Sequence, residues 1–294
     1  MTYGIEPKPR IRVGLVGAGI GPSLSPALHE EEGRRQGFSY TYCRFDLTDL
    51  GLDADGVRSV IDEARGRGYR GLNVTHPSKR AVIAHLRSLS PVAAELQAVN
   101  TVVFEADGPV GHNTDCDGFA RAFQRGLAGV SLQRVVQVGG GGAGAAVAHA
   151  ILSLGAERLA IHDRDPETAS ALAHSLRRRF GDERVAAGND LVAELVRADG
   201  VIHATPTGMA SHPGMPFDAS LLRPELWVAE VVYRPLETEL LRHARKLGCR
   251  TLDGGGMAVI QAALSFELFT GREANVDRMT AHLHRLLAAE AGPP

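Results

Sequence analysis

Two segments that lie far apart in the chain each follow a strand-like run with an ionisable side chain. Asn73–Lys79 ends in a lysine, and Gly111–Asp115 ends in an aspartate. An amine and a carboxylate held at one hydroxyl group can move its proton by general acid–base chemistry. Taken singly, each residue has an ordinary explanation, because Lys79 fits an exposed first helical turn and Asp115 fits an N-cap. The pair gains meaning only beside a further feature.

That feature is a glycine-rich turn after Asp115. The apolar run Val135–Val138 leads into the sequence GGGGAG at 139–144, and a helix of small residues follows. Glycines at the first, third and sixth positions allow a tight turn, close approach of the backbone to a pyrophosphate, and tight packing of helix on strand. Amide groups at the start of the helix then attract phosphate. The predicted cofactor contacts in this turn are Gly139, Gly141, Gly142, Ala143 and Gly144.

An acid ends the next predicted strand at the spacing that such a turn requires. Asp163 lies 19 residues beyond Gly144 (163 − 144), where a carboxylate hydrogen-bonds the adenosine ribose and repels a 2′-phosphate. NAD is therefore the expected cofactor. NADP remains the alternative, because the neighbouring Arg164 could pair with that phosphate. A lysine, an aspartate and a bound dinucleotide together are the parts needed to take a hydride and a proton from an alcohol.

A second glycine-rich turn, Gly17–Gly21, also follows a strand-like run, but its surroundings differ. Pro22 comes next, and the helix is predicted to open only at Ser25, with that serine as N-cap and Pro26 at the first helical position. No acid stands at the expected distance at the end of a second strand. We therefore assign this turn to substrate handling and not to a nucleotide.

Strand and helix patterns alternate along the chain, which predicts an α/β protein. The first run covers about 115 residues and includes a hairpin that turns at Ala106–Gly108. Strands are predicted at 11–17, 40–45, 69–74, 101–104, 110–113, 134–138, 158–162, 200–204 and 227–232. Helices are predicted at 25–37, 57–67, 79–86, 91–96, 117–127, 143–154, 166–180, 190–197, 236–247, 257–270 and 276–289.

The bulk composition argues against several classes of function. The 294 residues are 44% hydrophobic and 22% charged, with a formal net charge of −2, so no global field recruits nucleic acid or an anionic membrane. Three widely spaced cysteines, Cys43, Cys116 and Cys249, favour reduced thiols, and no ligand spacing indicates a metal site. No apolar run has the length of a membrane span or the pattern of a signal peptide. We expect a cytoplasmic enzyme with a small-molecule substrate, as a monomer or a homodimer.

Short motifs occur in a fixed order along the chain: Ser23–Ala27, Asn73–Lys79, Ala98–Val102, Asn113–Gly118, the glycine-rich turn, Val232–Pro235 and Asp253–Ala262. Any one of them is weak evidence, but together their order and spacing are highly specific. With these motifs the chain resembles the shikimate/quinate dehydrogenase family over nearly its whole length. Members of this family interconvert shikimate and 3-dehydroshikimate, or quinate and 3-dehydroquinate, with a nicotinamide cofactor.

The resemblance implies two α/β domains with the active site in the cleft between them. The substrate-binding and catalytic domain would comprise residues 1–117 with 254–294, and a Rossmann-like, doubly wound NAD(P)-binding domain would comprise residues 118–253. Lys79 and Asp115 match the catalytic pair. The two serines of the next group would hold the substrate carboxylate, with the tyrosine nearby, and the others would bind ring hydroxyls. The substrate-binding positions are matched by Ser23, Ser25, Thr75, Asn100, Tyr233 and Gln261.

Departures from the family bear on the cofactor and the substrate. His203 stands where relatives usually carry Asn, in a segment that includes the predicted cofactor residue Thr205; Gly256 is a further predicted cofactor contact. Asp163 stands where NADP users often carry Asn, which favours NAD and a catabolic role. Ser25 argues against a strict quinate specialist, because quinate-preferring relatives can carry Thr there.

The expected reaction is therefore oxidation of shikimate with NAD, with quinate as a second substrate and with Lys79 and Asp115 assisting the proton transfer. Lys79 either accepts the hydroxyl proton or stays charged and polarises the oxygen, and the sequence leaves both open. One alternative is an NADP-dependent biosynthetic shikimate dehydrogenase, or a homologue acting on an aminoshikimate-like analogue, for which Arg164 is the only support. The other is a non-catalytic sensor that binds nucleotide or shikimate.

Overall fold

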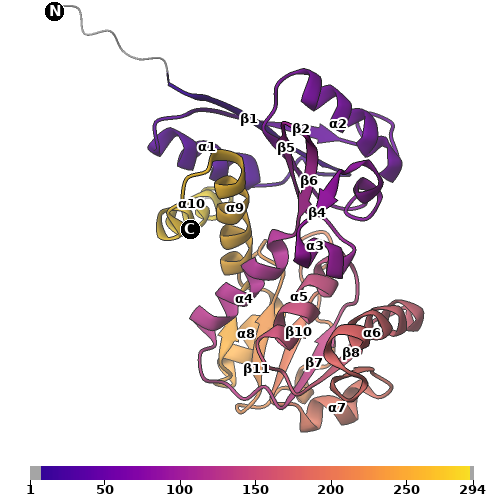
Figure 1. Cartoon of the computed structure of the whole chain (residues 1–294). Coiled ribbons are helices and arrows are strands. Elements are labelled where there is room, and N and C mark those ends of the chain that lie inside the picture. Colours follow the sequence, from indigo (N-terminus) through magenta and orange to yellow (C-terminus); the bar gives the residue numbers. More distant parts are fainter. Residues whose placement is uncertain (1–7, 292–294) are drawn as a thin grey trace, which may run out of the picture. The chain divides into compact units, whose positions relative to one another are not determined.

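The computed structural model describes residues 8–291, and these separate into two compact units, each with its own sheet. One unit holds residues 8–114 and 262–291, and the other holds residues 115–261. In Figure 1 the first stretch of the chain is indigo to purple and the last stretch is yellow, and both belong to the same unit. The chain thus leaves the first unit once and returns to it. The predicted α/β fold class is confirmed.

The first unit contains a six-stranded sheet in the order β2-β1-β3-β5-β6-β4. Strands β1, β2 and β3 run parallel, and β5 pairs antiparallel with both β3 and β6. The predicted hairpin is confirmed, because β5 and β6 pair across the turn at Ala106 and Asp107. The strand bounds are β1 Arg10–Gly17, β2 Ser39–Asp46, β3 Gly71–Val74, β4 Ser88–Leu89, β5 Thr101–Glu105 and β6 Gly108–His112.

Amphipathic helices cover this sheet. The buried residues of α2 recur at positions 57, 60, 61 and 64, which is the spacing of one helical face. Arg278 of α10 donates to the buried Glu32 of α1 at 2.6 and 2.8 Å, and this pair fastens the C-terminal helix to the N-terminal one. The helices are α1 Ser25–Arg35, α2 Val57–Gly66, α3 Pro91–Leu96, α10 Val276–Ala291 and the later part of α9 Gly254–Thr270.

The second unit contains a six-stranded sheet in the order β12-β11-β10-β7-β8-β9, with all neighbours parallel. The chain order reverses between β7 and β10, which is the doubly wound Rossmann arrangement. Ligands of such sheets bind beyond the carboxyl ends of the strands at this switch point. The strand bounds are β7 Arg134–Val138, β8 Arg158–His162, β9 Val185–Ala187, β10 Gly200–His203, β11 Trp227–Glu230 and β12 Thr251–Leu252.

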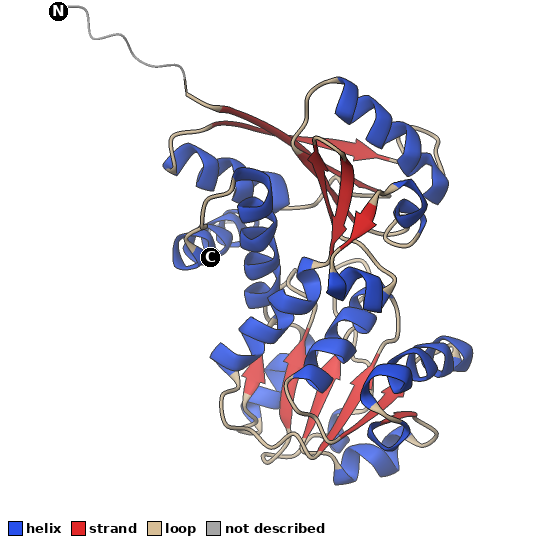
Figure 2. Cartoon of the chain, viewed as in Figure 1, coloured by secondary structure: helices blue, strands red, loops and turns tan. Residues whose placement is uncertain are grey.

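Figure 2 shows helices flanking the parallel strands of this second sheet. The helix predicted at 166–180 is confirmed residue for residue, because the Asp165 side chain caps it and Pro166 occupies its first turn. No helix among residues 8–291 combines the length and hydropathy of a membrane span. The helices of this unit are α4 Thr114–Gly126, α5 Gly142–Ser153, α6 Pro166–Phe180, α7 Leu191–Arg197 and α8 Glu239–Lys246.

Several local expectations were wrong. Leu24 and not Ser25 takes the N-cap position of α1, without a side-chain bond. The helix predicted at 79–86 is a short 3₁₀ helix, Ala81–His85, because the carbonyl of Lys79 accepts a bond from another segment. Asp115 lies inside the first turn of α4 and does not cap it. The missed strands β4, β9 and β12 have only two or three residues, too few to show a period.

Candidate functional site

The glycine-rich turn after β7 is packed so closely that side chains are excluded. Gly139 has a φ of 110°, and a Cβ there would lie 2.5 Å from the carbonyl oxygen of Ala204. A Cβ on Gly144 would lie 2.2 Å from the carbonyl oxygen of Gly139. Positive φ and contacts this short are tolerated only by glycine. The turn therefore has the tight bend and the close helix–strand packing that the sequence predicted.

The middle of the same turn is open. A Cβ on Gly141 would meet nothing within 4 Å, and Gly141 caps α5 without a side-chain bond. Helix α5 begins at Gly142, so its first amide groups have no acceptor within the helix. Such groups, together with the helix dipole, favour an anion. The cradle fits the pyrophosphate of a dinucleotide.

Gln137 holds the shape of this turn, and the sequence reasoning overlooked it. Its side chain is fully buried on β7, and its Nε2 atom donates to the carbonyl oxygens of Gly139 at 2.7 Å and Gly144 at 2.9 Å. The signal in the sequence was a polar residue inside an otherwise apolar strand. A buried amide requires partners, and here both partners belong to the nucleotide turn.

The structure brings Asp163 to the turn, at the end of β8. Its Oδ2 atom accepts from the backbone amide of Gly140 at 2.7 Å, and Oδ1 accepts from that of Asp165 at 3.0 Å. The side chain is half-buried, whereas the neighbouring Arg164 is exposed. The turn thus carries a negative charge at its edge, which opposes a 2′-phosphate. Contact with a ribose stays a prediction.

Thr205 lies beside the same turn. A Cβ on Gly139 would lie 2.9 Å from Cγ2 of Thr205, because β10 is the direct neighbour of β7. The hydroxyl of Thr205 accepts from the backbone amide of Thr207 at 3.2 Å and contacts the buried His203. The predicted cofactor residues of the turn, of the β8 end and of the β10 end therefore share one edge of the second sheet.

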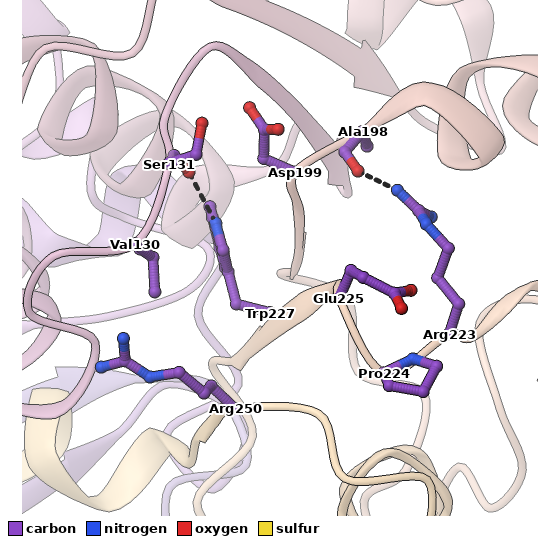
Figure 3. Close-up of a pocket in the computed structure, with 9 residues that line it drawn as sticks. All are labelled: Val130, Ser131, Ala198, Asp199, Arg223, Pro224, Glu225, Trp227 and Arg250. Atoms are coloured by element: carbon purple, nitrogen blue, oxygen red, sulfur yellow. Dashed lines mark hydrogen bonds between the residues drawn. The ribbon is translucent and has the colours of Figure 1, made fainter.

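A separate cavity of about 390 Å³ opens in the second unit, away from that edge. Its lining includes Asp199, directly before β10, and Trp227, the first residue of β11, so it lies at the amino ends of the strands. In Figure 3 the Trp227 indole donates to the carbonyl of Ser131, at 2.8 Å, and Arg223 donates to the carbonyl of Ala198. These arginine and tryptophan groups are occupied in holding loops together, so this cavity is not the candidate active site.

In the first unit, the Gly17–Gly21 turn has an acid after all. The carboxylate of Asp46, at the end of β2, accepts from the backbone amides of Gly19 at 2.9 Å and Ile20 at 2.7 Å. The expectation that no acid serves this turn was wrong. Asp46 lies 25 residues beyond Gly21 (46 − 21), outside the usual nucleotide-turn spacing, and its place follows from the strand pairing and not from the spacing.

The predicted substrate residues gather around this turn. Ser23 Oγ accepts from the amide of Ser25 at 3.3 Å, and Arg44 donates to the carbonyl of Ser23 at 2.9 Å. A Cβ on Gly17 would lie 2.3 Å from Cγ2 of Thr75. The turn and the end of β3 are therefore in direct contact, with a guanidinium beside the two serines.

The segments that carry Lys79 and Asn100 are joined by backbone bonds. The carbonyl of Lys79 accepts from the amide of Val99 at 2.8 Å, and Asn100 Oδ1 accepts from the amide of Thr114 at 2.8 Å. Asn100 is buried and Lys79 is half-buried. Thr114 ends the first unit, and the buried Asp115 follows it directly in the chain. This polar core fixes the backbone on either side of the predicted catalytic residues.

A buried network of short polar side chains supports Asn100, and the sequence did not reveal it as a network. Asn73 Nδ2 donates to Thr101 Oγ1 and Ser265 Oγ at 3.0 Å each, and Asn73 Oδ1 accepts from Tyr42 at 2.8 Å. Ser265 also lies 3.1 Å from the hydroxyl of Thr114. Since Ser265 is nearly two hundred residues from Asn73, only the fold could show the contact.

The remaining predicted residues belong to the second unit. Gln261 Nε2 donates to the carbonyl of Ala258 in its own helix at 3.0 Å, and a Cβ on Gly118 would lie 3.0 Å from Cβ of Gln261. Gly256 packs against α4, since a Cβ there would lie 3.3 Å from Cβ of Ala122. Tyr233 is half-buried in the loop after β11.

Comparisons with known proteins agree with this architecture. Residues 15–102 match the family model of the shikimate dehydrogenase substrate binding domain, and residues 254–284 match that of the shikimate 5′-dehydrogenase C-terminal domain. A shikimate dehydrogenase (NADP(+)) of Streptomyces avermitilis is 59% identical over 95% of this chain and 97% of its own. A quinate/shikimate dehydrogenase (NAD(+)) of Corynebacterium efficiens is 47% identical over 92% of this chain and 96% of its own.

Solved structures give the same result. The quinate dehydrogenase of Corynebacterium glutamicum in complex with NAD has a TM-score of 0.90 and 44% identity, covering 95% of this chain and all of its own. The shikimate 5-dehydrogenase of Thermus thermophilus in complex with NADP(H) and shikimate has a TM-score of 0.81 and 33% identity, covering 94% and 99%. Identity at this level over nearly the full length is decisive, and the chain belongs to the shikimate/quinate dehydrogenase family.

Proposed function

We propose that this protein interconverts shikimate and 3-dehydroshikimate by hydride transfer to NAD and accepts quinate as a second substrate. The observation that carries the proposal is the open glycine cradle with the carboxylate of Asp163 at its edge. The names of the Corynebacterium relatives, which include quinate, shikimate and NAD(+), support it. NAD, when bound in that cradle, supplies the acceptor for the hydride.

In this proposal Lys79 and Asp115 act on the hydroxyl that is oxidised, and general acid–base assistance of this kind supplies ~10²–10⁴-fold in rate. The hydroxyls of Ser23 and Ser25 bind the substrate carboxylate, with Tyr233 near it. The guanidinium of Arg44, which donates to the carbonyl of Ser23, adds positive charge there. The ring hydroxyls are bound by Thr75, Asn100 and Gln261.

We assign the substrate to the first unit and the dinucleotide to the second, with Gly142, Ala143, Thr205 and Gly256 among the cofactor contacts. The compact units divide after residues 114 and 261, and the assignment uses these bounds in place of the earlier 117 and 253. A monomer or a homodimer, in the cytoplasm, remains the expectation. The polar network around Asn100 supports a site built for a polyhydroxylated ligand, which needs several short donors and acceptors.

A second candidate is the NADP-dependent reaction. The Streptomyces avermitilis relative, at 59% identity, carries NADP(+) in its name, and the exposed Arg164 follows Asp163 directly. An arginine at that place can pair with a 2′-phosphate. Against it stands the carboxylate of Asp163, which is fixed at the turn by the amide of Gly140.

The test is the appearance of reduced nicotinamide absorbance with shikimate and with quinate, each combined with NAD and with NADP. The proposal expects turnover of both substrates with NAD and higher kcat/KM for shikimate. A strong preference for NADP would select the second candidate. Absence of turnover in all four combinations, with both dinucleotides still bound in a calorimetric titration, would favour a sensor instead.

A further inference from the structure

A buried hydrogen-bonded chain crosses the carboxyl edge of the second sheet. The side chains of His203, at the end of β10, and Glu230, at the end of β11, have no exposed surface. His203 Nδ1 lies 2.9 and 3.0 Å from the two carboxylate oxygens of Glu230. On the other side of the ring, Nε2 contacts the hydroxyl of Thr205. The ring thus connects the core to the first residues of the loop after β10.

Glu230 fixes the orientation of that ring. Its Oε1 atom accepts from the backbone amides of Val231 and Val232, at 3.1 Å each, and its Oε2 atom accepts from the hydroxyl of Thr238 at 3.2 Å. A carboxylate with these donors acts only as an acceptor. The hydrogen between Glu230 and His203 therefore belongs to Nδ1, and Nε2 faces Thr205 in either protonation state of the ring.

The far end of the chain is at the nucleotide turn. Thr205 Cγ2 would lie 2.9 Å from a Cβ on Gly139, and the Thr205 hydroxyl accepts from the amide of Thr207. A shift of Thr205 would therefore change both the border of the glycine cradle and the start of the loop that follows. Burying a histidine and a glutamate is costly unless every polar atom has a partner, and here the partners lead to this border.

We propose that His203 and Glu230 are positioning residues that hold the hydroxyl of Thr205 in place for the dinucleotide. The inference rests on the proposed function, because the dinucleotide is its ligand. His203 acts through Thr205, so removing either group removes the same contribution to dinucleotide binding. It deepens the sequence argument, which identified Thr205 as a cofactor residue but gave His203 no role.

A double-mutant cycle on the full chain tests this, with the Kd of NAD measured by calorimetry. His203→Asn shortens the side chain, and Thr205→Val removes the hydroxyl at nearly constant volume. Each single change is expected to weaken NAD binding by roughly tenfold, which corresponds to one hydrogen bond of about 1.4 kcal/mol. The double variant is expected to bind no more weakly than the weaker single variant. Additive losses, about a hundredfold in the double variant, would overturn the proposal.

Two matched variants separate positioning from structure. Thr205→Ser keeps the hydroxyl and should bind NAD within about threefold of the wild type, well short of the tenfold loss expected for a lost hydrogen bond. His29→Asn removes another buried imidazole, in the first unit, and should lower the unfolding temperature while the Kd for NAD stays unchanged. Loss of NAD affinity in His29→Asn, or equal losses in Thr205→Ser and Thr205→Val, would show that the effect is not specific to the hydroxyl.

Nuclear magnetic resonance of ¹⁵N-histidine-labelled wild type gives a readout that does not depend on any variant folding. The proposal expects hydrogen on Nδ1 of His203, and a shift of its Nε2 signal on addition of NAD that exceeds the shift of the equally buried His149. A bare Nδ1, or no selective change at His203, would contradict it. If the wild type binds NAD without turning substrate over, the proposed reaction fails while the positioning of Thr205 stands. Failure to bind either dinucleotide would end both.

Discussion

Two turns in this protein start alike and end differently. Each follows the first parallel strand of its unit, and in each the backbone amides of the turn donate to an aspartate at the end of the neighbouring strand. In the first unit that acid is Asp46, and in the second it is Asp163. The acceptor and the strand pairing are shared, so neither feature by itself marks a nucleotide site.

The difference lies in the packing of the glycines. In the second turn a Cβ on Gly139 or Gly144 would collide with backbone atoms, and α5 begins at once. In the first turn a Cβ on Gly19 or Gly21 would meet nothing within 4 Å, and α1 starts only at Ser25. A pyrophosphate needs close backbone and a nearby helix start, so only the second turn qualifies.

The largest effect is expected from Lys79, which the comparison places with the chemistry and not with the cofactor. Lys79→Ala should lower kcat by about 10²–10⁴-fold, the usual contribution of general acid–base assistance, while the Kd for NAD stays unchanged. Steady-state kinetics and calorimetry measure the two quantities. Arg80→Ala, the exposed neighbour, serves as the control and should leave kcat near the wild-type value. Near-normal turnover of Lys79→Ala would remove the catalytic assignment.

A smaller but still large effect is expected from the glycines of the second turn. Gly144→Val should destabilise the protein by at least about 2 kcal/mol, because the new side chain has no space, and it should weaken NAD binding. Gly21→Ala, in the first turn, should change neither the unfolding temperature by more than a degree or two nor the Kd for NAD, since its Cβ would point into open space. Equal destabilisation by the two changes would break the comparison.

The sequence predicted the second turn better than the first for a physical reason. The motif of the second turn is local: its strand, its glycines and Asp163 lie within about thirty residues of one another. The acid of the first turn was missed because β2 follows a longer connection, and its place depends on strand register. The buried partners Gln137, Glu230 and Ser265 were missed as well, since their bonds depend on packing and join residues that no short pattern connects.

The first turn should respond to pH. Burial tends to raise the pKa of Asp46, but the backbone amides of Gly19, Ile20 and Thr48 outweigh this and hold the pKa below its ordinary value of 3.8. A depressed folded-state pKa stabilises the protein above the unfolded-state value, and this contribution is lost as the pH falls through the folded-state value. The difference in unfolding temperature between wild type and Asp46→Asn should therefore be constant above about pH 5 and shrink below pH 4. A difference that grows on acidification would contradict this.

The central claim is that the two aspartates differ in function although they hold their turns alike. The direct measurement is the ratio of kcat/KM with NAD to kcat/KM with NADP in matched variants, Asp163→Asn and Asp46→Asn. The account predicts that Asp163→Asn shifts this ratio towards NADP by at least about tenfold, which corresponds to ~1.4 kcal/mol, and that Asp46→Asn leaves the ratio unchanged. An unchanged ratio in Asp163→Asn, or an equal shift in both variants, would contradict it.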